Sequence, residues 1–268
     1  MNRQESARRV ALVTGAARGI GAATAIRLAR SGYVVLAMDA CGSREYRPIG
    51  HTVPPPTPDD LFRMAAEAGS HCEPHVVDVA DAAAVRSAVD AAVATHGRLD
   101  VVVCAAAVID GGAPLWETPD KVLRELMDVD VHGVWNTAVA ALPHLIAGPS
   151  PHEARFIAIA SAAGHRGLFH LTAYAMAKHA VVGLVRGLQA DLVATGVVAI
   201  AVSPGSTDTA MLEATGQLYG LDPADFAGHH SIRRLLSVDD LAATVEFCCS
   251  PAAAALAGSV VHADGGFA

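Results

Sequence analysis

The sequence predicts an α/β protein, a doubly wound domain whose parallel, seven-stranded sheet is flanked by helices. Seven short runs rich in Val, Ile and Ala are continuous rather than alternating in polarity, as is typical of strands buried on both faces. Alanine-rich stretches between them are long enough for crossover helices. A glycine-rich segment directly follows the first run, where a doubly wound fold turns into its first helix.

Residues that start or stop regular structure bound these elements. The strands are expected at 9–14, 33–39, 74–78, 99–104, 155–161, 197–203 and 259–263. The helices are expected at 19–31, 81–97, 120–147 and 172–195. Asp81 is placed as an N-cap, and Gly97 and Gly196 as helix stops. No linker divides the chain, so one domain over 1–268 is expected.

Composition excludes several classes of function. Of the 268 residues, 52% are hydrophobic and 17% are charged, as in a compact globular protein. The 19 basic and 27 acidic residues give a formal charge of −8 without a basic run, which argues against a nucleic-acid surface and favours a small-molecule ligand. No apolar run could cross a bilayer or act as a secretory signal, so a cytoplasmic protein is expected. The five scattered cysteines are expected to be reduced thiols.

A phosphate-binding loop is predicted between the first strand and the first helix. Gly15, Gly19 and Gly21 in "VTGAARGIGAATAIRLA" allow a tight turn that brings backbone N–H groups and a helix N-terminus to a pyrophosphate. Asp39 closes the second strand 18 residues beyond Gly21, where a carboxylate can accept hydrogen bonds from an adenosine ribose. Together the two signals predict a Rossmann-type dinucleotide site.

The same carboxylate favours NAD over NADP, because it would repel a 2′-phosphate. The two residues after Asp39 are not basic. Arg18 is the one residue that argues against a preference for NAD, since its guanidinium can reach a phosphate. It can equally rest over the adenine or point to solvent. Asp78 and Val79, at the end of the third strand, are expected beside the adenine.

A tyrosine and a lysine stand four residues apart in the expected helix 172–195. In "LTAYAMAKHAVVGL" this spacing places Tyr174 and Lys178 on one helix face, one turn apart. A structural role, with Lys178 reaching water, is the alternative to a catalytic one. Ser161, at the end of the fifth strand, either caps the next turn or binds a substrate oxygen.

Over essentially its full length the chain resembles the short-chain dehydrogenase/reductase family, in TGxxxGIG at 14–21, the serine at 161, Tyr-x-x-x-Lys at 174–178 and "SPG" at 203–205. The resemblance implies that Tyr174 is the general acid/base and that Ser161 holds the substrate oxygen. Lys178 would bind the nicotinamide ribose and favour the phenolate, since an opposite charge lowers a pKa by roughly 1–3 units. Further expected cofactor contacts are Ile20, Ala105, Ala106, Pro204, Gly205 and Thr207.

Two departures from the family pattern bear on this site. Residues 104–107 are Cys-Ala-Ala-Ala, where the family usually has Asn-Asn-Ala-Gly. Asp130 stands where the family usually has the asparagine that holds a proton-relay water. Asp130 is therefore a candidate catalytic residue, but a carboxylate adds negative charge near Lys178, and a structural role is the open alternative.

The segment 40–60 interrupts the rhythm of strands and helices. It holds five prolines and is longer than a usual connection of this kind. It is either a tolerated surface insertion or a flap over the cofactor. With "AAAVIDGGAPLWETPD", "SAAGHRGLFHLTAY" and "VVHADGGF" it resembles the mycofactocin-associated branch of the family, some members of which are labelled carveol dehydrogenases. That resemblance implies an NAD that does not exchange and a mycofactocin electron acceptor.

The segment 205–230 after the sixth strand is expected to form a lid over the substrate, with packing alone as the alternative role. Its apolar side chains are Met211, Leu212, Leu218, Tyr219, Leu221 and Phe226. Residues 205–226 include no Lys or Arg, so an apolar secondary alcohol is the expected substrate. His165, His170 and Trp116 are expected to line the pocket in structural roles, and they show no metal-ligand spacing.

The sequence also bears on the oligomeric state and on alternative functions. The helices at 120–147 and 172–195 and the C-terminal "GSVVHADGGFA" resemble the packing elements of tetrameric family members, so a homotetramer is expected. The alternatives to a mycofactocin-linked enzyme are an ordinary dehydrogenase using free NAD(P) and a dinucleotide-binding regulator without turnover.

Overall fold

The computed structural model describes residues 8–267, in which seven parallel strands form one sheet of order β3-β2-β1-β4-β5-β6-β7. The strands are β1 (Val10–Thr14), β2 (Val34–Asp39), β3 (Cys72–Val76), β4 (Val101–Cys104), β5 (Arg155–Ile159), β6 (Val198–Pro204) and β7 (Val260–Ala263). The strand order reverses between β1 and β4, and in doubly wound sheets ligands bind outside the carboxyl ends of such strands. The predicted fold class is confirmed.

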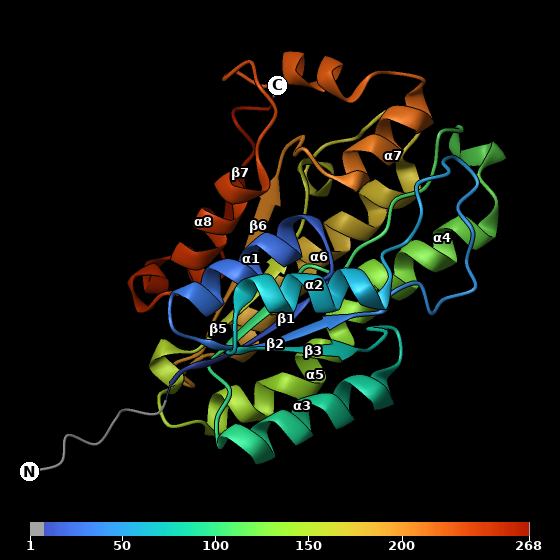
Figure 1. Ribbon diagram of the computed structural model, residues 1–268. Helices are drawn as coiled ribbons and strands as arrows, with labels where there is room; N and C mark the ends of the chain where they lie inside the picture. The colour runs from blue at the N-terminus through green and yellow to red at the C-terminus, as the bar shows by residue number, and fades with distance from the viewer. Residues whose placement is uncertain (1–7, 268) are drawn as a thin grey trace, which may run out of the picture.

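Helices cover both faces of the sheet (Figure 1). One hydrophobic core lies under α1 (Gly19–Arg30), α2 (Pro58–Ala68) and α8 (Val238–Cys249). A second core lies under α3 (Ala82–His96), α5 (Gly133–Ala147) and α6 (Thr172–Asp191). A third apolar cluster joins the N-terminal half of α6 to α4 (Asp120–Leu126) and α7 (Ala210–Tyr219). That third cluster surrounds the candidate site.

Most of the expected elements are confirmed with small shifts at their ends. The Asp81 side chain caps α3 by accepting two backbone N–H groups, and Gly97 ends that helix at φ 72°. The third strand lies two residues earlier than the expected 74–78, and it is partly exposed because it forms an edge of the sheet. Gly196 is not a helix stop, since α6 has already ended at Asp191. With φ 89° it shapes the turn into β6 instead.

The expected helix at 120–147 is not a continuous α-helix. Between α4 and α5, Met127–His132 forms a π-helical turn, which inserts an extra residue into the helical bonding pattern. Asp130 lies within this turn and is fully buried. Because such turns are frequent at functional sites, the irregularity supports a special role for this residue.

The segment 40–60 divides into a loop and the start of a helix. Thr57 caps α2 in a capping box with Asp60, and Pro58 is the first helical residue. The insertion proper is therefore 40–57. Figure 1 shows this loop running in blue from β2 past α4 and α7 before it returns to α2.

Two expectations from composition can be compared with the structure. The cysteines are free thiols, as expected: Cys41, Cys72, Cys104, Cys248 and Cys249. Within residues 8–267, no helix combines the length and the apolarity that crossing a membrane requires.

Candidate active site

The glycine loop after β1 packs closely against the loop after β4. A Cβ on Gly15 would lie 2.6 Å from the Cα of Ala106, and a Cβ on Gly21 would collide with the carbonyl group of Gly15. Gly15 and Gly19 also have positive φ values, 68° and 61°, which favour glycine. No side chain among the described residues caps the N-terminus of α1, where Ile20 lies. Its N–H groups are thus available to an anion.

A threonine supports the chain where the family's asparagines are missing. Thr14 Oγ1 accepts the backbone N–H groups of Ala105 and Ala106, both at 3.2 Å. Cys104, which precedes them, is buried. The loop after β4 is therefore held against the glycine loop without amide side chains.

The carboxylate of Asp39 also lies against the glycine loop. Its Oδ2 accepts the N–H of Ala17 at 3.1 Å, and its Oδ1 accepts the N–H of Cys41 at 2.9 Å. These bonds fix the orientation of both oxygens at the end of β2. Arg18 is exposed, and its guanidinium donates a 2.8 Å hydrogen bond to the carbonyl oxygen of Pro54 in the insertion. The arginine thus fastens the insertion to the glycine loop.

The structure brings all four candidate catalytic residues together. Tyr174 and Lys178 lie one turn apart on α6, 6% and 2% exposed, with Lys178 Nζ 5.6 Å from the centre of the tyrosine ring. Ser161, just after β5, lies beside Tyr174, where its hydroxyl favours the phenolate, and it also caps the next turn by accepting the N–H of Ala163 at 3.1 Å. Asp130 Oδ2 lies 3.1 Å from Lys178 Nζ.

The electrostatics of this group differ from the expected lowering of the Tyr174 pKa. Burial is the main cause of the raised pKa of Tyr174, the charge of Lys178 opposes it, and Asp130 adds to it by disfavouring the phenolate. Burial opposes the charge on Lys178, but Asp130 and Tyr174 outweigh burial and raise the pKa of the ammonium group. Burial likewise raises the pKa of Asp130, against the charge of Lys178. The expected influence of Lys178, which favours the phenolate, is present, but burial is the larger influence and the net pKa shift of Tyr174 is upward.

Asp130 joins the catalytic group to the loop after β4. Its Oδ1 accepts the N–H of Val108 at 2.8 Å. Its Oδ2 makes the ion pair with Lys178, but within residues 8–267 it accepts no well-directed hydrogen bond. That oxygen retains the capacity to accept one, as a residue holding a relay water requires.

The segment at the end of β6 contains three of the expected cofactor contacts, and a fourth residue, not expected from the sequence, lies beside the glycine loop. Pro204 ends β6 and is buried, and Gly205 follows it. The hydroxyl of Thr207 donates to the carbonyl oxygen of Gly205 at 3.1 Å, so it is engaged within the loop. Thr209 caps α7, and its Cγ2 would lie 3.5 Å from a Cβ on Gly19. Its position before a helical stretch was the signal that could have identified it as a cap facing the glycine loop.

The insertion closes over the expected adenine side through Arg44. Its Nη1 donates to Asp78 Oδ2 at 2.8 Å, while Nε and Nη2 donate to the two carboxylate oxygens of Glu125 at 2.7 and 2.8 Å. Val79 packs beside Asp78 against Gly133 of α5. Because bidentate arginine–carboxylate pairs are strong and directional, Arg44 fixes the insertion to α4 and to the loop after β3.

A second contact holds the middle of the insertion on the loop after β4. Asp110 is 1% exposed. It accepts hydrogen bonds from the hydroxyl of Tyr46 at 2.5 Å and from the N–H groups of Ile49 and Gly50 at 2.9 and 3.0 Å. Neither Asp110 nor Arg44 stands out in the sequence, because their partners are distant along the chain.

The expected lid folds over Tyr174 and touches the insertion. Within 205–230, Met211 places its sulfur 3.8 Å from the Tyr174 hydroxyl. Gln217 of α7 accepts the N–H of Thr52 at 2.8 Å. The lid and the insertion are therefore joined to each other.

The surroundings of Tyr174 are apolar. The cluster packed with it includes Val53, Ile109, Leu168, Leu171, Met211, Leu218 and Tyr219. Of the residues expected to line the pocket, Trp116 is 83% exposed and His165 packs against His262. His170 stacks on Phe169.

Comparison with known proteins finds relatives over nearly the whole chain. A family model described as enoyl-(acyl carrier protein) reductase matches residues 15–268. The (-)-trans-carveol dehydrogenase of Rhodococcus erythropolis is 35% identical over 77% of this chain and 74% of its own. The cis-4-hydroxycyclohexanecarboxylate dehydrogenase of Sinomonas cyclohexanicum is 33% identical over 97% of both chains. The crystal structure of a carveol dehydrogenase from Mycobacterium avium in complex with NAD has a TM-score of 0.89 at 30% identity, covering 97% of this chain and 98% of that one.

Proposed function

Since the chain belongs to the short-chain dehydrogenase/reductase family, we propose that it is an NAD-dependent enzyme that interconverts an apolar secondary alcohol and its ketone. The observation that carries this proposal is the group formed by Ser161 and the buried Tyr174 and Lys178 beneath an apolar lid. The names of the carveol and hydroxycyclohexanecarboxylate dehydrogenases support a cyclic secondary alcohol.

The residues present fit NAD. Side chains larger than glycine would fill the cradle at Gly15 and Gly21, where a pyrophosphate would approach the N–H groups of α1. Asp39 presents two fixed oxygens that can accept from ribose hydroxyls and would repel a 2′-phosphate. When bound, NAD supplies the hydride acceptor for the alcohol carbon. The related carveol dehydrogenase structure is a complex with NAD.

Tyr174 is the proposed general acid/base. In alcohol oxidation its phenolate removes the hydroxyl proton, while Ser161 holds the same oxygen by a hydrogen bond. Forming that phenolate in a buried site is costly, and the charge of Lys178 offsets part of the cost. Asp130 sets the charge of Lys178 and offers Oδ2 to a relay water.

We further infer that NAD stays bound between turnovers and is reoxidised in place by a mycofactocin-type acceptor. Arg18, Arg44 and Asp110 tie the insertion over the cofactor side of the sheet, and Gln217 ties it to the lid. These contacts would have to break before a cofactor beneath them could leave. An ordinary dehydrogenase using free NAD(P) is the second candidate, because the family chemistry itself does not require retention.

Denaturing extraction of protein purified without added cofactor separates these candidates. We expect one NAD to be released per chain, and a secondary alcohol with an artificial electron acceptor to give many turnovers without added NAD. An empty protein that reduces added NAD at ordinary rates, on the order of 1–1000 per second, would refute retention but not the alcohol chemistry.

A homotetramer is part of the proposal. Trp135 and Val139 lie one turn apart on α5 and are 59% and 43% exposed, and Met176 on α6 is 47% exposed. Apolar side chains gathered on a helix face favour burial against another chain. A tetramer mass is expected from light scattering at micromolar concentration, and a monomer mass would contradict it.

A further inference from the structure

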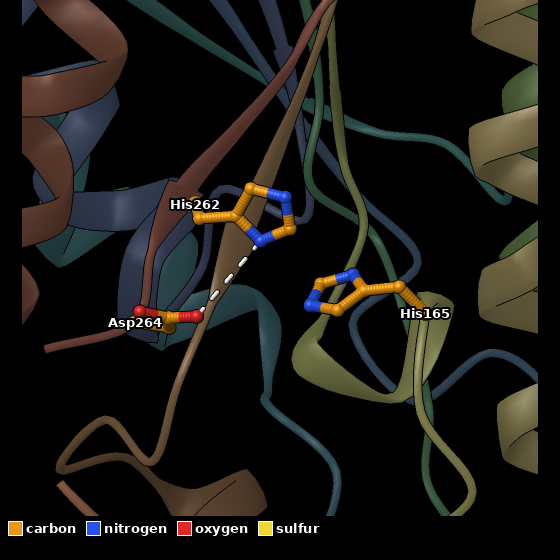
Figure 2. A group of neighbouring side chains, drawn as sticks. All are labelled: His165, His262 and Asp264. Carbon is orange, nitrogen blue, oxygen red and sulfur yellow. Dashed lines mark ion pairs between the residues drawn. The ribbon is translucent and has the colours of Figure 1, made fainter. Parts of the chain in front are cut away.

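Three side chains that can bind a metal meet beside the end of β7. His165 ends the short turn that Ser161 caps, His262 lies within β7, and Asp264 directly follows β7. One ligand atom from each lies within 4.8 Å of the other two. Figure 2 shows His165 directed at His262 and Asp264, with a ring nitrogen facing them. No metal-ligand spacing along the chain marks this group, because the fold alone brings His165 to β7.

His165 presents an unused nitrogen to this group. Its Nε2 is buried and has no hydrogen-bond partner in the described part of the chain. Its Nδ1 lies 3.4 Å from Ser203 Oγ, a contact that orients the ring. A histidine oriented through one nitrogen while the other points at neighbouring donors is typical of a metal ligand. An unpaired buried ring nitrogen would otherwise destabilise the fold.

The other two side chains supply oriented donors. Asp264 Oδ1 accepts the N–H of Gly266 at 3.0 Å, and Oδ2 lies 3.9 Å from His262 Nδ1. The rings of His165 and His262 meet edge to face, with centroids 4.3 Å apart. Zinc bonds of about 2.0–2.2 Å require tetrahedral donors to be about 3.4 Å apart. The His262 side chain is 51% exposed, so it is free to rotate over the remaining distance.

The surroundings leave room for a further ligand. A cavity of about 190 Å³ is lined by His262 and Asp264, together with residues of α8. It provides room for water beside His262 and Asp264. Arg166 would weaken the binding of a cation, but its guanidinium is stacked 5.6 Å from the centre of the Phe267 ring. Two imidazole nitrogens and one carboxylate oxygen are a donor set that suits Zn²⁺.

We propose that His165, His262 and Asp264 bind one Zn²⁺, with water completing its coordination. The ion would link the end of β7 to the turn that begins at Ser161. Because it would bind the folded chain and not the unfolded one, it would raise the melting temperature. This site is separate from the alcohol chemistry and does not depend on the proposed substrate.

Isothermal titration of untagged, chelator-treated, full-length protein with ZnCl₂ tests this proposal. We expect one Zn²⁺ per chain, and a higher melting temperature with Zn²⁺ than without it. His262→Ala and Asp264→Asn should each weaken binding by about 10–100-fold or more. Asparagine at 264 keeps an oxygen for the turn bond to Gly266, so loss of binding there is not loss of the turn.

The matched control is His132→Ala, which removes one member of an exposed His–Asp pair, 3.3 Å from Asp128. It should leave the Zn²⁺ affinity unchanged, because that pair has no second histidine among its partners in the described chain. Failure of the wild-type protein to bind Zn²⁺ would overturn the proposal. Equal affinity in His262→Ala and wild type, with matching circular dichroism spectra, would overturn it as well.

Discussion

The catalytic group and the insertion are positioned by different means. Tyr174 and Lys178 lie on a regular helix, where a spacing of four residues by itself determines their relative geometry. The insertion 40–57 has no regular structure and is held by side-chain contacts to distant segments, chiefly through Arg44 and Asp110. Local sequence therefore predicts the first region, whereas the second depends on a few polar contacts that can be removed one at a time.

Tyr174→Phe should abolish the function of the catalytic region and leave the insertion in place. Loss of the general acid/base should reduce turnover of secondary alcohols by about 10²–10⁴-fold. The amount of retained NAD should be unchanged, because the tyrosine hydroxyl is hydrogen-bonded to Met211 of the lid and is not among the polar contacts that hold the insertion. Turnover is measured with an artificial acceptor, and retention by extraction.

Tyr33→Phe is the matched control, since its phenol bonds to Arg9 far from Ser161. Full activity in Tyr174→Phe would show that Tyr174 is not the general acid/base. Absence of turnover in the wild-type protein with every secondary alcohol tried would favour the regulator without chemistry.

Asp39→Ala tests a residue that belongs to both regions, because it ends a regular strand and lies under the insertion. Hydrogen bonds to charged groups are worth about 1.5–3 kcal/mol, so NAD binding should weaken by about 10–100-fold. The difference in binding affinity between NAD and NADP should become smaller, because the carboxylate that repels the 2′-phosphate is gone. Asp39→Asn keeps a hydrogen-bond acceptor. It should reduce the preference for NAD over NADP with a smaller loss of NAD affinity. An unchanged preference in cofactor titrations would remove Asp39 from the site.

Asp110→Ala should loosen the attachment of the insertion and leave the catalytic region unchanged. It leaves the donors at Tyr46, Ile49 and Gly50 without their acceptor, at a cost of about 1–3 kcal/mol. Release of bound NAD into an excess of labelled NAD should then be roughly 10-fold faster. The exposed carboxylate of Asp90 provides the control, as Asp90→Ala should not alter release. Unchanged release in Asp110→Ala would show that the insertion is not the barrier.

The sequence predicted those parts of the molecule whose cause is local. Continuous apolar runs predicted the seven strands, and Asp81 and Gly97 marked both ends of α3 because caps act on adjacent backbone groups. Tyr174 and Lys178 were placed together by helical spacing alone. The third strand was misplaced by two residues because its burial pattern is that of an exposed edge.

The parts that sequence could not predict depend on contacts between distant segments. Nothing local distinguishes Asp110 from other loop carboxylates, and its importance comes from donors in the insertion. His165 and His262 are likewise neighbours only in the folded chain. The raised pKa of Tyr174 reflects burial and the carboxylate of Asp130, both of which require the tertiary structure.

Asp130→Asn should have the smallest effect, and it sharpens the comparison because Asp130 lies in the π-helical turn between α4 and α5. The carboxylate raises the pKa of both Tyr174 and Lys178. Removing its charge should therefore lower both pKa values. Alcohol oxidation requires the Tyr174 phenolate beside a charged Lys178, so both limbs of its pH profile should move toward lower pH.

The measurement is kcat/KM for alcohol oxidation across pH, on NAD-loaded protein with an artificial acceptor. Asparagine keeps an oxygen that can accept the Val108 N–H, so the loop after β4 should remain attached to the π-helical turn. A purely structural role for Asp130 would reduce activity equally at all pH values, without displacing the profile. A displaced profile would show that the Asp130 carboxylate adjusts the proton affinities of Tyr174 and Lys178. The helix alone determines the relative geometry of that pair. The carboxylate that tunes it is buried by an irregular turn that the sequence did not reveal.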